Sequence, residues 1–197
     1  MAKKEKVRAE LVKAARKAFT VRGFSKTTMD DIAFAAGKAK STLYYYFESK
    51  EDAFQSVIDF EGEALRDVLL EIIRDTRRTA KQKIYDYIFT RWQEFEKLGN
   101  LYQTMRREFL ENYDFVQKYR RKYDKLEVQL ISIILNQGIE SREFSIASDD
   151  VEMVAYTLVL SMKAIEIPFF AEDKYHTIRP KLKALIDVLF YGIVVRE

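Results

Sequence analysis

The stretch from Lys38 to Tyr46 carries the side chains of this sequence that are best suited to binding a nucleic acid. Lysine, serine and threonine donate hydrogen bonds to base edges and phosphates, and tyrosine contacts the sugar–phosphate backbone. For the consecutive tyrosines the alternative is a half-buried helix face, and for the lysines it is a solvated surface. The candidate residues are Lys38, Lys40, Ser41, Thr42, Tyr44, Tyr45 and Tyr46.

Catalytic and metal-binding chemistry has few candidate residues. The sequence has no cysteine and a single histidine, His176. Thiolate nucleophiles and cysteine-ligated zinc are therefore excluded, and any histidine-based triad would depend on one residue in an expected loop. The carboxylate pairs at 149–150 and 172–173 fall at expected helix ends, where capping explains them. We expect no enzyme activity, no metal site and no cofactor.

Positive charge is concentrated at the N-terminal end of the chain. Residues 1–50 hold 12 Lys and Arg against five Asp and Glu, a net of +7, whereas residues 51–197 have a net of −4. This balance is typical of a head that meets a polyanion, although a solvated lysine-rich surface would also produce it. The most apolar stretch, 151–170, is interrupted by charges and by Pro168. We therefore expect no membrane span, no signal peptide and a cytoplasmic protein.

Helices must position these side chains. Six Gly and two Pro are too few to separate many strands, and apolar residues recur at helical spacing, so we predict an all-α fold of about nine helices. A first helix runs from about Val7 to Gly23, and Thr27 or Thr28 caps a second that Gly37 ends. A short third helix follows at 40–46, and Ser49 begins a fourth. Further helices are predicted at 81–97, 101–111, 114–137, 149–170 and 177–195.

Two short helices joined by a glycine turn, with longer helices on either side, predict a helix-turn-helix. Ala33 and Ala36 are small enough for the helices to cross closely, and Gly37 lies where the chain reverses. The third helix would then face the major groove of DNA. We predict a DNA-binding domain over 1–48 and a helical ligand-binding and dimerisation domain over 49–197.

In these residues the sequence resembles the TetR/AcrR family of transcriptional regulators. Beyond residue 57 the resemblance extends only to length, helicity and the order of elements. It implies a homodimeric regulator, a repressor in most members, that binds a palindromic operator and responds to a small molecule. The matching residues are Gly23-Phe24, Thr27-Thr28-Met29, Asp31-Ile32-Ala33, Ala36-Gly37, Thr42-Leu43-Tyr44-Tyr45-Tyr46-Phe47, and Lys50-Glu51 before Phe54.

The resemblance also implies roles for single residues. Thr27 or Thr28 would touch a phosphate at the N-terminus of the second helix, and Lys50 would neutralise another. Base edges would be approached by Lys40, Ser41 and Thr42, and the DNA backbone would be packed by Tyr44 and Tyr45.

Three positions depart from the family pattern. Lys38 stands where a small apolar residue is usual, Ala39 where serine is usual, and Ser41 where glycine is frequent. Without a hydroxyl at position 39 the third helix lacks its usual cap, which is worth about 1 kcal/mol. A phosphate contact from Lys38 would compensate.

The last two helices carry apolar residues on two faces. Such a helix needs two partners, and the second could be the same helices of another subunit. We expect a homodimer through 149–170 and 177–195; the alternative is complete burial within one chain. The second faces comprise Met153, Thr157, Leu160, Ala164 and Ile167, and then Ala184, Val188, Tyr191 and Val195.

Aromatic residues are dense between 85 and 123 and could line a pocket for a flat or lipophilic effector, although ordinary core packing is the alternative. Two other functions stay open. One is a dimeric DNA-binding protein with no small-molecule response, and the other is a helical enzyme or adaptor whose basic end docks on an acidic protein. The candidate pocket residues are Trp92, Phe95, Tyr102, Met105, Phe109, Tyr123, Tyr156 and, as a polar anchor, Glu166.

Overall fold

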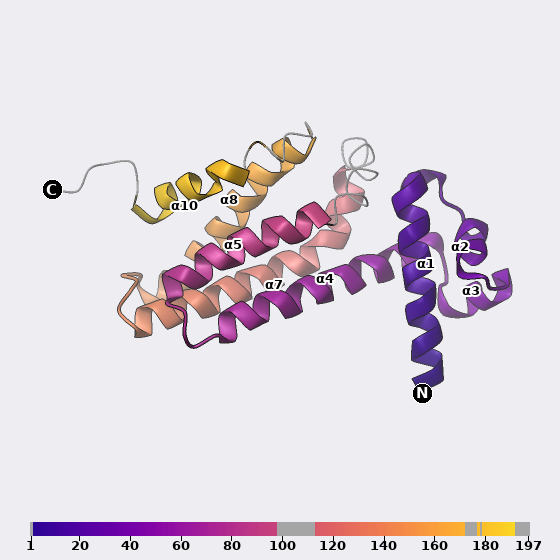
Figure 1. Ribbon diagram of the computed structural model, residues 1–197, viewed down its shortest axis with the longest axis horizontal. Helices are drawn as coiled ribbons and strands as arrows, with labels where there is room; N and C mark the ends of the chain where they lie inside the picture. The colour runs from indigo at the N-terminus through magenta and orange to yellow at the C-terminus, as the bar shows by residue number, and fades with distance from the viewer. Residues whose placement is uncertain (1, 98–112, 172–176, 178, 192–197) are drawn as a thin grey trace. The chain divides into compact units, whose positions relative to one another are not determined.

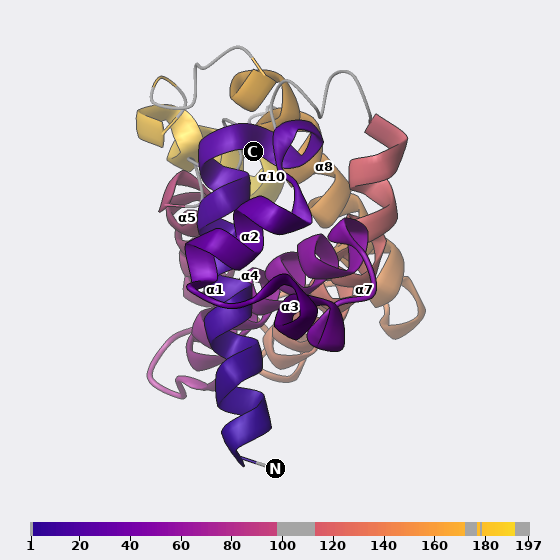
Figure 2. The same ribbon diagram turned by 90° about the vertical axis from the view of Figure 1, so that its right-hand side faces the viewer.

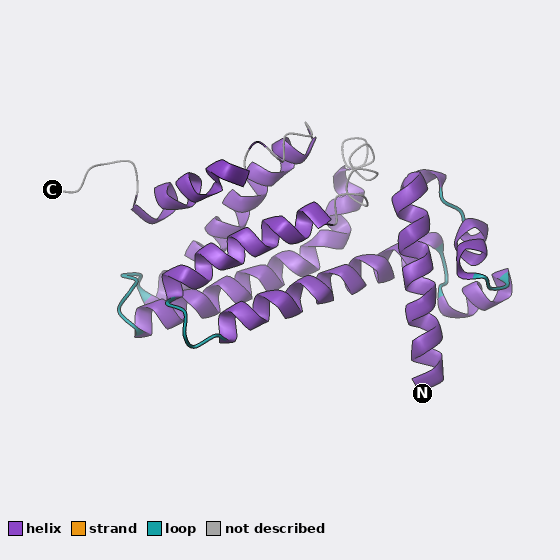
Figure 3. Ribbon diagram, viewed as in Figure 1, coloured by secondary structure: helices purple, strands orange, loops and turns teal. Residues whose placement is uncertain are grey.

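The computed structural model describes residues 2–97, 113–171, 177 and 179–191, and side chains within 4–94, 121–165, 177, 180–188 and 190–191. Within these ranges every regular element is helical and no strand is present, which confirms the predicted all-α fold (Figure 1, Figure 3). Internal contacts divide the chain into two compact units. We call them the head unit, Met1–Arg66 with Lys97–Arg121, and the body unit, Asp67–Glu96 with Lys122–Glu197.

The head unit begins with three helices, of which α2 and α3 lie on one side of α1 (Figure 1, Figure 2). Their bounds are α1 (Ala2–Lys26), α2 (Met29–Ala36) and α3 (Lys40–Tyr46). As expected, Gly23 takes a positive φ of 77°, so the first helix is interrupted there and a last turn continues to Lys26. The helix-turn-helix predicted from the sequence is therefore present as α2, a turn and α3.

The N-terminal half of α4 (Lys50–Arg74) closes the core of the head unit. Ser49 accepts a hydrogen bond from the Asp52 backbone N–H at 3.1 Å, as expected for the residue that begins this helix. Because α4 contributes to this core, the head unit reaches Arg66; the domain boundary predicted after residue 48 stays a prediction. The core comprises Leu11, Val12, Ala15, Ala18, Phe19, Met29, Ile32, Ala33, Leu43, Phe47, Ala53, Phe54 and Val57.

Polar contacts of Arg8 and Arg16 also join α1 to α4 within the head unit. The Arg8 guanidinium donates to the Ser56 hydroxyl at 2.8 Å, and Arg16 pairs with Glu61 at 2.6 Å. Glu61 is buried, and this burial raises the pKa of its carboxyl while the Arg16 guanidinium opposes the shift. The two helices are therefore held by apolar packing and by polar contacts at two separate levels.

The body unit contains the end of α4 and four further helices within the described residues. Tyr85 on α5 stacks on Phe190 of α10 at 5.4 Å between ring centroids, and Phe190 stacks on Phe144 at 6.0 Å. Predicted bounds agree to within a few residues, except in the last helix, and the helix predicted at 101–111 lies outside the described residues. The helices are α5 (Ala80–Lys97), α7 (Tyr113–Glu140), α8 (Val151–Ala171) and α10 (Leu182–Tyr191).

Two expected helix boundaries in the body unit were wrong. The last helix was expected from 177, but Pro180 lies in a 3₁₀ turn, Arg179–Lys181, and α10 begins only at Leu182. Gly138 was expected to end a helix, but α7 continues to Glu140. Glycine is needed there for space, because a Cβ at Gly138 would lie 2.1 Å from Cδ2 of Phe144. The Phe144 ring thus lies directly against the backbone of α7.

The loop that follows α7 is fastened to the start of α5. The Glu143 carboxylate accepts hydrogen bonds from the backbone N–H groups of Ala80 and Lys81 at 3.0 and 3.1 Å. Desolvation raises the pKa of Glu143, but these bonds, together with one from the Ser141 hydroxyl, outweigh it and lower the pKa below its usual value. The carboxylate thus satisfies N–H groups that a helix N-terminus leaves without intrahelical partners. Among the described residues, no helix is both long and apolar enough to cross a membrane.

We predict that Gly138→Ala lowers the free energy of unfolding by about 1–3 kcal/mol, because the added methyl group overlaps the Phe144 ring. Chemical denaturation of the purified protein measures this. The same change in a Phe144→Ala background should be neutral or stabilising, since alanine is the better helix former. Equal losses in both backgrounds would show that the ring contact is not the cause.

Candidate nucleic-acid interface

The turn between α2 and α3 sets the direction of α3. We call α3 the recognition helix, because it is the helix expected to face the major groove. Gly37 adopts φ 60° and ψ 36°, a left-handed conformation that glycine takes without strain. Its N–H donates to the Phe34 carbonyl, and the Lys38 N–H donates to the Ala33 carbonyl, both at 3.0 Å. The carbonyls of Ala33 and Phe34 in the last turn of α2 are thus satisfied while the chain reverses. Ala39 begins α3 without any side-chain cap, as expected from its lack of a hydroxyl.

One face of α3 is anchored in the core and the other is open. Leu43 and Phe47 are completely buried, and the Arg8 guanidinium lies 5.8 Å from the centre of the Phe47 ring. On the open side, Ser41 and Tyr44 are exposed, and 68% of the Tyr45 side chain is accessible. Thr42 and Tyr46 are half-buried. The predicted base-reading and backbone-packing side chains therefore lie along one helix, which is held from behind.

The two threonines before α2 have different surroundings. Thr27 is 1% exposed, and its hydroxyl donates to the Gly23 carbonyl at 2.6 Å, so it fastens the end of α1. Thr28 is exposed and forms a capping box with Asp31: each side chain accepts the backbone N–H of the other residue, at 3.1 and 2.9 Å. The Thr28 backbone N–H and the Thr28 hydroxyl both donate to the Asp31 carboxylate and lower its pKa. Of the two threonines, only Thr28 is exposed, and its contact with a phosphate stays a prediction.

The three candidate lysines also differ. Lys38 is exposed at the turn, whereas the Lys40 ammonium pairs with Asp30 of α2 at 2.8 Å. The hydrogen bond with Asp30 raises the pKa of Lys40. Lys50 donates to the Phe24 carbonyl at 2.9 Å and lies 4.4 Å from the centre of the Phe24 ring. Its ammonium therefore binds backbone carbonyl groups at the C-terminal end of α1. The phosphate contact expected for Lys50 stays a prediction.

Two further residues on this surface were not singled out from the sequence. The Lys4 ammonium lies 5.0 Å from the centre of the Tyr45 ring, which brings the basic start of α1 next to the recognition helix. Its signal was the run of lysines at the start of the chain. Asp30, like Asp31, was considered only for the capping box and as a favourable charge at the start of α2, and the helical pattern alone could not show its pairing with Lys40.

The predicted effector pocket falls largely outside the described side chains. Trp92 on α5 is buried and Tyr123 on α7 is half-buried. Tyr156 was expected to line the pocket, but 49% of it is exposed, because it faces outward on α8 beside Met153 and Leu160. Phe95, Tyr102, Met105, Phe109 and the side chain of Glu166 lie outside the described part of the chain.

Within the body unit, the inward face of α5 carries polar residues one turn apart. Lys83 donates to the Ile73 carbonyl and to Gln137, at 2.8 and 2.7 Å. Arg91, only 1% exposed, pairs with Glu127 of α7 at 2.5 Å. Burial and the nearby Glu127 charge raise the pKa of Tyr87, which lies between them, well above its usual value. The described interior of the body is therefore a mixture of apolar and paired charged groups.

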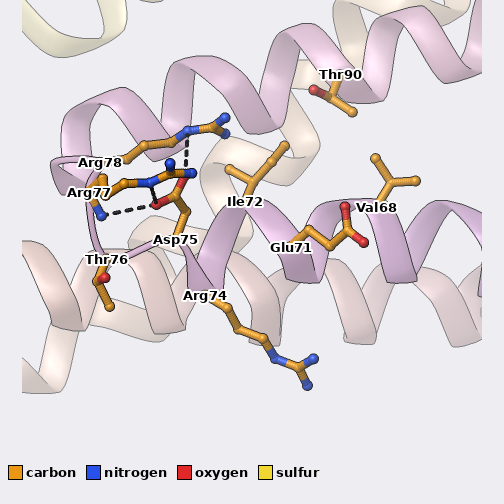
Figure 4. Close-up of a pocket in the computed structure, with 9 residues that line it drawn as sticks. All are labelled: Val68, Glu71, Ile72, Arg74, Asp75, Thr76, Arg77, Arg78 and Thr90. Carbon is orange, nitrogen blue, oxygen red and sulfur yellow. Dashed lines mark hydrogen bonds and ion pairs between the residues drawn. The ribbon is translucent and has the colours of Figure 1, made fainter.

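A pocket at the surface of the body unit lies beside the loop between α4 and α5 (Figure 4). Arg77 and Arg78 both bind the Asp75 carboxylate there and, with Arg77 contributing most, lower its pKa to about 2. This polar, arginine-rich pocket is unlike the apolar one expected for an effector. The described residues include no group of three or more His, Cys, Asp or Glu that could hold a metal ion. Its lining comprises Val68, Glu71, Ile72, Arg74, Asp75, Thr76, Arg77, Arg78 and Thr90.

Solved structures of transcriptional regulators share this fold along almost the whole chain. A FadR regulator from Bacillus subtilis, in complex with stearoyl-CoA, matches with a TM-score of 0.74 at 22% identity, covering 94% of this chain and 99% of that one. A FadR repressor from Thermus thermophilus, in complex with lauroyl-CoA, matches with a TM-score of 0.68 at 21% identity, covering 96% of each chain.

Sequence comparisons identify the family. Residues 11–57 match the model of the bacterial regulatory proteins of the tetR family, which includes the whole of α2, the turn and α3. The uncharacterised helix-turn-helix regulator YfiR of Bacillus subtilis is 30% identical over 161 aligned residues, covering 72% of this chain and 69% of that protein. These relatives are transcriptional regulators rather than enzymes. The chain therefore belongs to the TetR family of bacterial transcriptional regulators.

Proposed function

We propose that this regulator is a ligand-responsive repressor that binds a palindromic DNA operator as a homodimer. The observation that carries the proposal is the recognition helix α3, which is anchored by Leu43 and Phe47 and exposes Ser41, Tyr44 and Tyr45, with Thr42 half-buried beside them. The charge of residues 1–50, +7, favours association with a polyanion. A DNA-binding helix-turn-helix uses this combination, with phosphate contacts that position the protein and base contacts that specify the site.

An apolar surface that is exposed among the described residues of the body unit supports the dimer. Met153, Tyr156 and Leu160 follow one face of α8, and they are 66%, 49% and 45% exposed. Val188 and Tyr191 of α10 are 47% and 50% exposed. Side chains of this size are stabilised by leaving water, and the same helices of a second copy would bury them. Two copies related by a twofold axis would then read two inverted half-sites, about 34 Å or one helical turn apart.

A small-molecule response would follow from two conformations of the dimer. An effector weakens DNA binding only when it binds better to the conformation that fits DNA poorly. The two FadR regulators of similar fold were solved with stearoyl-CoA and lauroyl-CoA, which makes long-chain acyl-CoA thioesters the first compounds to test. The protein would be found in the cytoplasm, where both the chromosome and these thioesters occur.

Replacing a base-reading residue and replacing a phosphate-binding residue should change binding to operator and random DNA in different ways. We predict that Thr42→Ala weakens binding to the operator by about 1–3 kcal/mol and hardly changes binding to random DNA. Lys38→Ala should weaken both alike and reduce the salt dependence of binding by about one phosphate contact. Fluorescence anisotropy with both duplexes at several salt concentrations measures this. Equal losses for Thr42→Ala on the two duplexes would contradict its base-reading role.

The dimer depends on the exposed face of α8 in this proposal. We predict that Leu160→Asp makes the protein monomeric at micromolar concentration and abolishes tight operator binding, because a buried unpaired carboxylate would oppose association. Sedimentation velocity gives the oligomeric state. Val21→Asp is the matched control, since Val21 on α1 is 72% exposed and belongs to the head unit, whereas α8 belongs to the body unit. A dimeric Leu160→Asp protein would refute this interface.

The effector response can be tested directly. We predict that stearoyl-CoA or lauroyl-CoA raises the melting temperature and lowers operator affinity at least tenfold, which requires about 1.4 kcal/mol of coupling. Coenzyme A without an acyl chain is the control and should do neither. Selective operator binding that no acyl-CoA and no compound in a broad thermal screen alters would indicate a dimeric DNA-binding protein without a small-molecule response.

A further inference from the structure

Asp30 and Lys40 form an ion pair across the helix-turn-helix, on the surface predicted to meet DNA. Asp30 is the second residue of α2, and Lys40 is the first residue of α3. Both carboxylate oxygens lie close to the Lys40 ammonium, at 2.8 and 2.9 Å. The two side chains are 65% and 55% exposed, so the pair remains open to a ligand on its outer side.

The stability of the fold gives little reason for this pair. An ion pair that is exposed to this degree contributes little to folding. The favourable acidic charge at the start of α2 is already supplied by Asp31, which also forms the capping box with Thr28. A carboxylate on a surface that approaches phosphates weakens sequence-independent binding, because it repels the DNA backbone. Asp30 is therefore costly for general affinity, and this cost is consistent with a role in selectivity.

The chemistry of the pair is complementary to one kind of base pair. In the major groove guanine offers two acceptors, O6 and N7, and the cytosine paired with it offers the N4 amino donor. Lysine has three N–H donors, so at least one remains for guanine while the ammonium binds the two Asp30 oxygens. The Asp30 carboxylate has acceptor sites beyond those that bind Lys40, and these can accept the N4 proton of cytosine. An A·T pair presents a thymine methyl group and an acceptor where the carboxylate needs a donor.

We propose that Asp30 and Lys40 act together to read a single G·C base pair in each half of the operator. The inference rests on the proposed function, because it requires that α3 enters the major groove. Asp30 holds the Lys40 ammonium toward the base edge and away from neighbouring phosphates. Discrimination at this one position then depends equally on both side chains.

Selection from a pool of random DNA duplexes tests the proposal. The purified wild-type protein and the Asp30→Ala, Lys40→Ala and Lys38→Ala variants each select from the pool, and the bound DNA is sequenced. Wild type should enrich a palindrome with one G·C position per half-site that becomes degenerate in both the Asp30→Ala and the Lys40→Ala selections. The other positions should be kept. Lys38→Ala, which removes an exposed lysine two residues away, should keep every preference.

Affinity measurements at that position give the second readout. Replacing the G·C pair by A·T should weaken wild-type binding about 5- to 150-fold and should change the binding of either single variant by less than about twofold. The double variant should lose no more discrimination at this position than either single variant. Asp30→Ala should bind random DNA more tightly than wild type does. Asp30→Ser keeps a residue that suits a helix N-terminus, and it replaces Asp30→Ala if that protein melts at a lower temperature.

The failure of this inference can be told apart from failure of the proposed function. A wild-type protein that enriches no sequence overturns both. If wild type enriches a palindrome but Asp30→Ala keeps every preference, or Asp30→Ala and Lys40→Ala relax different positions, the joint reading is wrong while the operator-binding function stands.

Discussion

A helix of seven residues is too short to be stable in water by itself, so the recognition helix α3 depends on what it packs against. Leu43 and Phe47 make these packing contacts, because both are completely buried in the core shared by α1, α2 and α4. Complete burial of such side chains contributes about 1.5–3 kcal/mol each. Because Leu43 and Phe47 hold α3 in place, its exposed residues Ser41, Tyr44 and Tyr45 remain available for DNA, whereas the half-buried Tyr46 packs against the core.

Hydrogen bonds at the ends of α2 hold the helix-turn-helix in position on this core. Glycine at 37 reverses the chain with its carbonyl partners satisfied, and Thr28 with Asp31 satisfies the start of α2. Arg8 and Arg16 then join α1 to α4 through Ser56 and Glu61. Within the head unit, the recognition surface is therefore set by backbone hydrogen bonds at the turn and by packing at the back. A change in α4 near Ser56 or Glu61 would therefore also alter the contacts that hold α1.

Much of this arrangement could be predicted from the sequence, because local rules decide it. The positive φ of Gly23 and Gly37, the cap at Thr28 and the missing cap at Ala39 all follow from residue type and spacing. Contacts distant in sequence could not be read in this way. Helical spacing gives no sign that Lys50 binds the carbonyl of Phe24, or that Gly138 makes room for Phe144. Tyr156 was expected to face a pocket and is 49% exposed, because an aromatic residue on a two-faced helix suits either face; its pocket role stays a prediction.

The buried charges of the body unit limit how its helices can move. Arg91 of α5 pairs with Glu127 of α7, and Lys163 of α8 pairs with Asp124 one turn earlier on α7. Sliding α5 along α7 by a single turn would break the buried Arg91–Glu127 pair, and leaving one buried charge without its partner costs about 3–5 kcal/mol. Sliding α8 would break the half-buried pair of Lys163 and Asp124. Register shifts between these three helices are thereby penalised in both directions. Any rearrangement in this part of the protein is expected to carry α5, α7 and α8 as one rigid block.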